Sequence, residues 1–196
     1  MYTLFGLIFL FITTVTSYST GPPPSVCDDP DLMPGHDEFD FQTGPSPFEL
    51  TVKPKRDGFY HVKISATTDV PFKGYIIQVQ YPDNHTESEL AGFPVGDFEP
   101  EFHPDSDDPV HKGFNCAIDE ELANTVSHNA KGNHTTVTAK WFPPQDIDET
   151  VVFRATVVKT KPEFWSLEKT LPVVGIWPKA VGSYNGKKTK YNYIQI

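Results

Sequence analysis

The sequence has few of the features that mark a membrane protein or an enzyme. After Ser17, proline, glycine or a charged residue interrupts every apolar run well before it reaches the roughly 20 residues that cross a bilayer as a helix. There is no His-Glu-X-X-His, Gly-X-Ser-X-Gly or Cys-X-X-Cys motif, so zinc hydrolysis, serine catalysis and dithiol redox chemistry have no sequence support. We therefore expect a non-enzymatic protein without a membrane span or a cofactor.

The sequence also lacks a recognisable metal-binding pattern. Its seven histidines are widely scattered, and their spacing predicts no metal site. Residues 97–108 contain six carboxylates, a ligand type that Ca²⁺ prefers. This stretch has neither the glycine nor the terminal glutamate of a calcium-binding hand, so a solvated acidic loop is the preferred interpretation and calcium binding the alternative.

The amino-terminal end has the pattern of a secretory signal peptide. Residues 4–12 are almost entirely apolar, and the small residues Val15, Thr16 and Ser17 follow. The apolar run is too short to span a membrane, and small residues are what signal peptidase requires. We predict a signal peptide over residues 1–17 and a secreted, extracellular mature protein.

Only two cysteines are present, Cys27 and Cys116. In an oxidising extracellular environment they are expected to form a disulfide. A loop of this length contributes roughly 4.5 kcal/mol in the chain-entropy model.

Two acceptor sequences for N-glycosylation agree with secretion. Asn84-His-Thr and Asn133-His-Thr each lie in a polar stretch between strand-like runs. The sequence therefore predicts surface glycosylation at Asn84 and Asn133.

The formal net charge is −10, and it is unevenly distributed along the chain. An acidic body argues against nucleic acid as a partner, since phosphate binding needs a concentrated basic face. Residues 169–196 contain no Asp or Glu. Within this tail, lysines interleaved with tyrosines are a candidate site for an anionic lipid headgroup, a phosphate-bearing cell-wall polymer or a sulfated glycan, namely Lys179, Lys187, Lys188 and Lys190. A tail that only keeps the acidic body soluble is the preferred interpretation, and ligand binding is the alternative.

The residues between the two ends of the chain have the pattern of short β-strands. Apolar residues alternate with polar ones or form short continuous runs between proline-rich and glycine-rich turns, at residues 48–52, 60–64, 75–79, 137–141 and 151–158. One weak helical pattern covers residues 118–126. The proline-rich segment 21–44 is expected to be an extended arm over the sheets, held by Cys27. We predict one antiparallel β-sandwich over residues 18–168 and a separate tail over residues 169–196.

An ordered set of motifs along the chain resembles the reeler domain, the module at the amino end of reelin that also occurs alone in small secreted invertebrate defence proteins. The set comprises Cys27–Asp29, Met33–His36, Pro45–Val52, Phe72–Gln78, Pro94–Phe98, Cys116, Val126–His128, Val137–Trp141 with Pro143 and Pro144, and Val151–Val158. The likeness is greatest to the single-domain defence proteins. It implies an immunoglobulin-like, all-β sandwich and a role in binding microbial surfaces.

The leading functional hypothesis is therefore a secreted innate-immune protein that binds lipopolysaccharide, peptidoglycan or glucan. Its partners would be microbial surface polysaccharides or lipid conjugates, and we expect a monomer. The first alternative is an extracellular matrix or adhesion module without an immune role. The second is a module that binds haem or metal, because related domains are fused to oxidoreductases.

Overall fold

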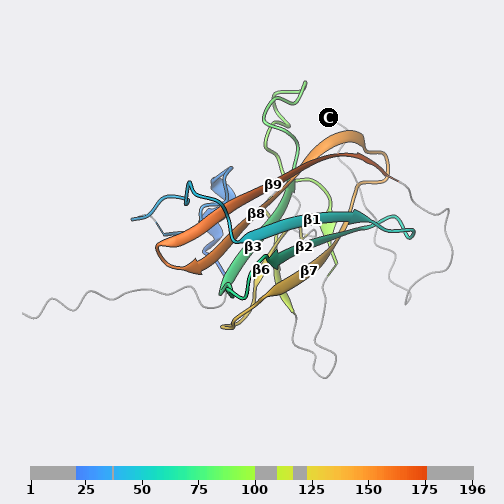
Figure 1. Ribbon diagram of the computed structural model, residues 1–196. Coiled ribbons are helices and arrows are strands. Elements are labelled where there is room, and N and C mark those ends of the chain that lie inside the picture. Colours follow the sequence, from blue (N-terminus) through green and yellow to red (C-terminus); the bar gives the residue numbers. More distant parts are fainter. Residues whose placement is uncertain (1–20, 37, 100–109, 117–122, 176–196) are drawn as a thin grey trace, which may run out of the picture.

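The computed structural model describes residues 21–36, 38–99, 110–116 and 123–175 (Figure 1). The predicted signal peptide, most of the acidic stretch and the four tail lysines lie outside the described residues. Among the described residues, no helix is long and apolar enough to cross a membrane.

Two antiparallel sheets form the body of the protein, in agreement with the predicted β-sandwich. The four-stranded sheet has the order β1-β2-β7-β4, and the five-stranded sheet has the order β5-β6-β3-β8-β9. In chain order the strands are β1 (Phe48–Pro54), β2 (Tyr60–Ala66), β3 (Gly74–Gln80), β4 (Asp97–Phe98), β5 (His111–Phe114), β6 (Thr125–His128), β7 (Thr136–Phe142), β8 (Asp148–Thr160) and β9 (Glu163–Val174). The five strand-like runs of the sequence correspond to β1, β2, β3, β7 and β8.

Alternation along the strands places one apolar face of each sheet in the core between the sheets. Val62 and Ile64 of β2 are fully buried, whereas Lys63 between them is exposed. Successive side chains of a strand point to opposite faces, so this pattern separates a core face from a solvent face.

Trp141 lies at the centre of this core. Its ring packs against Phe153 of the opposite sheet, with ring centroids 5.1 Å apart. Its indole N–H donates a hydrogen bond of 2.9 Å to the carbonyl of Val95. Trp141 is therefore a fully buried core residue.

Strand β3 differs from the others because every one of its residues is buried. Tyr75, Ile77 and Val79 belong to the core between the sheets. Ile76 points the other way and packs with Val26 and Leu32 in a second, smaller cluster. The arm that carries these two residues therefore covers the outer face of β3.

Two sequence-based boundaries need correction. Strand β9 continues to Val174, so the predicted boundary at 168–169 falls inside a strand and the sandwich extends further. Thr125 and Val126, at the end of the predicted helix, belong to strand β6; residues 118–122 of that segment lie outside the described residues. The pairing of β6 with β3 and β5 outweighs a weak local helical preference.

Replacing Trp141 with phenylalanine should lower the free energy of unfolding by about 2–4 kcal/mol, because it leaves a cavity and an unpaired buried carbonyl at Val95. Urea denaturation followed by far-UV circular dichroism measures this change. The exposed Val174 provides the control, and Val174→Ala should stay within about 0.5 kcal/mol of the unsubstituted protein. Equal stabilities for the two variants would contradict the central position of Trp141.

Candidate functional site

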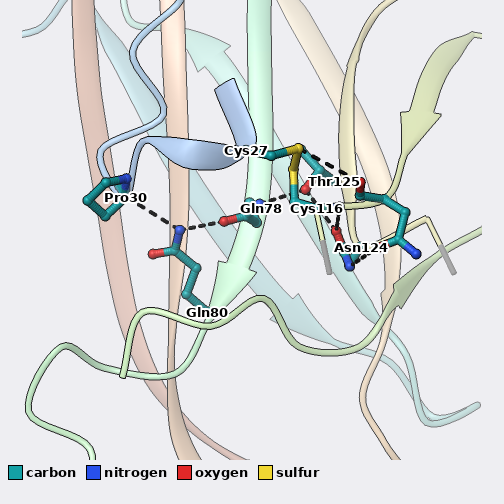
Figure 2. The surroundings of a disulfide bond; sticks show 8 residues. Cys27, Pro30, Gln78, Gln80, Cys116, Asn124 and Thr125 are labelled. Carbon is teal, nitrogen blue, oxygen red and sulfur yellow. Dashed lines mark hydrogen bonds between the residues drawn. A yellow bond between two sulfur atoms is a disulfide. The ribbon is translucent and has the colours of Figure 1, made fainter. Parts of the chain in front are cut away.

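The predicted disulfide is present and fixes the amino-terminal arm. Cys27 lies in a short 3-10 helix, Pro24–Asp28, and is bonded to Cys116 just after β5. The Cα atoms of the two cysteines are 4.9 Å apart. Figure 2 shows this bond beside the outer face of the five-stranded sheet.

A chain of buried side-chain amides continues from the disulfide region to the arm (Figure 2). The Gln80 amide donates to the carbonyl of Pro30, at 3.4 Å, and to the side-chain oxygen of Gln78. The Gln78 amide in turn donates to the Thr125 hydroxyl at 2.7 Å. Buried polar groups need such partners, so these two glutamines join the arm to strands β3 and β6.

The same chain ends at the disulfide. The Thr125 hydroxyl donates to the side-chain oxygen of Asn124 at 3.1 Å, and the backbone N–H of Cys116 donates to that oxygen at 2.8 Å. Asn124 also donates to Asn115 at 2.7 Å. The polar residues beneath the arm are therefore used for structure.

Arg154 of β8 is a second anchor for the arm. Its side chain is 5% exposed, and its Nε lies 2.9 Å from a carboxylate oxygen of Glu168. It also donates to the carbonyl of Pro30 and lies 3.4 Å from Asp31. A buried guanidinium needs such compensation, and the arm supplies part of it.

The two glycosylation candidates are exposed. Asn84 lies in a turn after β3, and Asn133 lies in the loop between β6 and β7. His85, the middle residue of the first acceptor sequence, lies 2.5 Å from Glu149, and its ring lies 4.9 Å from that of Tyr81 at a tilt of 57°. The hydrogen bond to Glu149 raises the pKa of His85. Both positions are accessible for modification, which remains a prediction.

Three histidines gather around the buried Tyr75, an arrangement that the sequence analysis missed. The ring centroids of His111, His128 and His134 lie 5.7, 6.1 and 5.9 Å from that of Tyr75. Burial, followed by the proximity of the other two histidines, lowers the pKa of His134. Only the pairing of distant strands creates this cluster, so spacing along the chain gave no signal for it.

His111 has a structural role in this cluster. Its Nε2 lies 2.9 Å from the carbonyl of Thr138 on β7, and its Nδ1 lies 2.5 Å from the Tyr75 hydroxyl. The Nε2–H therefore donates to the Thr138 carbonyl, and Nδ1 shares a hydrogen bond with the Tyr75 hydroxyl. His111 thereby connects the two sheets. Within the described part of the chain, no group of three His, Cys, Asp or Glu residues could hold a metal ion.

The beginning of the acidic stretch is also structural. The Asp97 carboxylate accepts a hydrogen bond of 2.8 Å from the backbone N–H of Ala123. Burial raises the pKa of Asp97 to about 6, although backbone hydrogen bonds act in the opposite direction. Glu99 lies 3.0 Å from Lys140. The other carboxylates considered for calcium lie outside the described residues, as do Lys179, Lys187, Lys188 and Lys190.

The family model described as the Reeler domain matches residues 25–175, a range that includes the disulfide and all the described strands. "Putative defense protein Hdd11-like" of Samia ricini is 28% identical over 88% of this chain and 96% of that protein. "Putative defense protein" of Bombyx mori is 28% identical over 86% of this chain and 92% of that protein. "Putative ferric-chelate reductase 1 homolog" of Drosophila melanogaster is 28% identical over 80% of this chain, but the match covers 23% of that protein.

Among solved structures, the human F-spondin reeler domain (fragment 1) resembles this chain with a TM-score of 0.50. The two are 16% identical, and the alignment covers 69% of this chain and 95% of that chain. At this identity the likeness shows a common fold alone.

Removing the disulfide with Cys27→Ser and Cys116→Ser should reduce the free energy of unfolding by roughly 3–5 kcal/mol, because the unfolded chain loses its cross-link. Equilibrium urea denaturation gives this value. Thr43→Ala, an exposed change in the arm, should have an effect below about 0.5 kcal/mol. An unchanged denaturation midpoint in the double variant would show that the arm does not depend on its covalent anchor.

Replacing Asp97 with asparagine should remove a pH-dependent loss of folding stability. The pKa of the folded state, about 6, exceeds the ordinary value of 3.8, so the folded protein binds this proton more strongly than the unfolded chain does. The contribution of Asp97 to the free energy of unfolding is therefore fully present below the ordinary pKa and is lost as pH rises towards the folded-state pKa. Urea denaturation across this range should show the Asp97→Asn variant gaining stability relative to the unsubstituted protein as pH rises. A pH-independent difference would exclude a buried, titrating Asp97.

Proposed function

Because this chain belongs to the Reeler domain family, we propose that it is an extracellular defence protein that binds microbial surface polymers and does not catalyse a reaction. The observation that carries the proposal is the near full-length alignment with the two moth proteins named as defence proteins, which covers 96% and 92% of those relatives. These relatives support a defence-type role, and binding of microbial polymers is the mechanism proposed for it.

The architecture agrees with an extracellular binding protein. Its one disulfide suits an oxidising environment, and its two candidate glycosylation sites are exposed. Gln78 beneath the arm and the pair of Tyr75 and His111 in the core are engaged in structural hydrogen bonds. Binding would therefore use exposed loops and exposed sheet surface, where side chains can vary without disturbing the core.

The match to the reductase carries no proposal of reductase activity, because it covers 23% of that protein. The tail lysines at 179, 187, 188 and 190 remain candidate contributors to binding. A variant that ends at residue 175 lacks these lysines and therefore measures binding by the sandwich alone.

The direct test is retention of the secreted, glycosylated protein on immobilised lipopolysaccharide, peptidoglycan and β-glucan. We expect dissociation constants in the micromolar range or below for at least one polymer, measured by surface plasmon resonance against an uncoated surface. The variant ending at residue 175 shows whether the tail contributes. Absence of retention on all three microbial polymers, together with retention on host matrix glycans, would replace the defence role with an adhesion role.

A further inference from the structure

Three half-buried rings lie together on the outer face of the four-stranded sheet. Phe59 immediately precedes β2, His61 lies two residues further on that strand, and Phe142 is the last residue of β7. The ring centroid of Phe59 lies 5.2 Å from that of His61 and 5.5 Å from that of Phe142. We call these three residues the aromatic patch.

Alternation along the strands explains why the patch points away from the core. Tyr60 and Trp141 are paired across β2 and β7, and both pack in the core between the sheets. Their chain neighbours Phe59 and Phe142 therefore point to the opposite side of the sheet. The planes of these two rings are inclined by 35°, so neither ring stands edge-on to the other.

The backbone around the patch is well fixed. The N–H of Lys55 donates a hydrogen bond of 2.8 Å to the carbonyl of Phe59, and the N–H of Gly58 donates one of 3.2 Å to the carbonyl of Lys55. Gly58 has a φ of 82°, a conformation that favours glycine. Phe142 is followed by two prolines, whose φ is restricted. Rings held in this way need little further ordering when a ligand binds.

The charges beside the patch are balanced. The outer face of this sheet carries three lysines and three carboxylates, namely Lys53, Lys63, Lys140, Glu49, Asp97 and Glu99. One lysine and one carboxylate are ion-paired, since Lys140 lies 3.0 Å from Glu99. A surface without an excess of either sign favours neither a polyanion nor a polycation.

Polar side chains continue the face along the strands. Lys63 of β2 is opposite Thr51 on one side and Thr138 on the other. This row lies one step beyond the row of His61, and residues two apart on a strand are roughly 7 Å apart on the same face. An extended ligand lying on the rings therefore has hydroxyl and ammonium groups beside its next units.

We propose that the aromatic patch binds a neutral, β-linked glucan, with sugar rings stacked on Phe59 and Phe142 and hydroxyl groups bonded to the polar side chains beside them. This assignment rests on the proposed function and names its site and ligand class. The substituents of a β-linked glucose ring are equatorial, so both faces of the ring present C–H groups. Such a flat apolar face packs against an aromatic ring, while the hydroxyl groups at its rim need hydrogen-bond partners.

The test compares three double variants of the full secreted protein. Phe59→Leu/Phe142→Leu removes the flat rings but keeps apolar contact between the strands. Phe59→Tyr/Phe142→Tyr keeps the rings. The matched control, Phe39→Leu/Phe41→Leu, makes the first change at two half-buried rings of the arm. Thermal denaturation verifies that each variant folds. The probe is laminarin, a soluble β-linked glucan, and the comparison polymer is dextran, an α-linked glucan.

We expect the Phe59→Leu/Phe142→Leu variant to bind laminarin roughly tenfold more weakly, because stacking is lost. The tyrosine variant and the arm variant should stay within about threefold of the unsubstituted protein. The unsubstituted protein should bind dextran roughly fivefold more weakly than laminarin or less well still. Its affinity for laminarin should change less than about twofold between about 0.05 and 0.5 M salt, because a neutral ligand has no charge to screen.

Four results overturn the inference. They are equal weakening in the patch and arm variants, no weakening in the patch variant, equal binding of laminarin and dextran, and no binding of the unsubstituted protein to laminarin. The last two are measured on the unsubstituted protein and do not depend on whether a variant folds. A steep loss of affinity with salt also overturns it, in favour of a charged ligand.

These outcomes separate the inference from the proposed function. If lipopolysaccharide or peptidoglycan retains the protein while laminarin does not, the proposed function stands and the assignment of ligand and site fails. If laminarin retains the protein and the patch variant is unaffected, the proposed function stands and the site fails. If no microbial polymer retains the protein, both fail.

Discussion

The covalent link between Cys27 and Cys116 is the constraint on which the rest of the structure depends. It ties a proline-rich segment, which has little secondary structure of its own, to the sheet that this segment covers. Ile76 can then be buried on the outer side of β3, and Gln78 and Gln80 can lie in a fully buried strand because the arm and β6 supply their hydrogen-bond partners. Without the arm, Ile76 would be exposed to water and the Gln80 amide would lose its hydrogen bond to the carbonyl of Pro30.

The disulfide also makes the outer faces of the two sheets different, because it holds the arm against one of them. Val26 and Leu32 of the arm cover Ile76 on the outer face of the five-stranded sheet, whereas Lys53 and Lys63 on the outer face of the four-stranded sheet are exposed. The core between the sheets holds the two sheets in a fixed position relative to each other. Trp141 packs in this core, and the hydrogen bond from His111 to the Thr138 carbonyl connects the two sheets.

Much of the fold was predictable from local patterns, because alternation and turn residues report directly on strands. The runs at 48–52 and 137–141 are examples. Strand β9 was not among the predicted strands, since Glu168 and Lys169 interrupt its apolar pattern. Glu168 has a tertiary explanation, because it lies beside the buried Arg154. Pairing with β8, and not its own pattern, defines this strand.

The cluster of histidines around Tyr75 could not be predicted in the same way. The sequence directed attention to the lysines of the tail, where positive charges are close together along the chain. His111 and His128 are brought to Tyr75 by the pairing of β5 with β6 and of β6 with β3, and His134 by its bridge with Phe72. Local sequence patterns predict local structure, whereas a site built from several strands can be predicted only when the pairing of those strands is known.

The most direct test of this account is hydroxyl-radical footprinting of the native, oxidised protein, read residue by residue by mass spectrometry. The account predicts that Val26, Leu32 and Ile76 are labelled as slowly as Ile77 in the core, and that the exposed Val174 is labelled much faster. Labelling of Val26 and Leu32 at the rate of Val174 would show that the arm does not cover the sheet, and would contradict the division of the sandwich into a covered face and an open one.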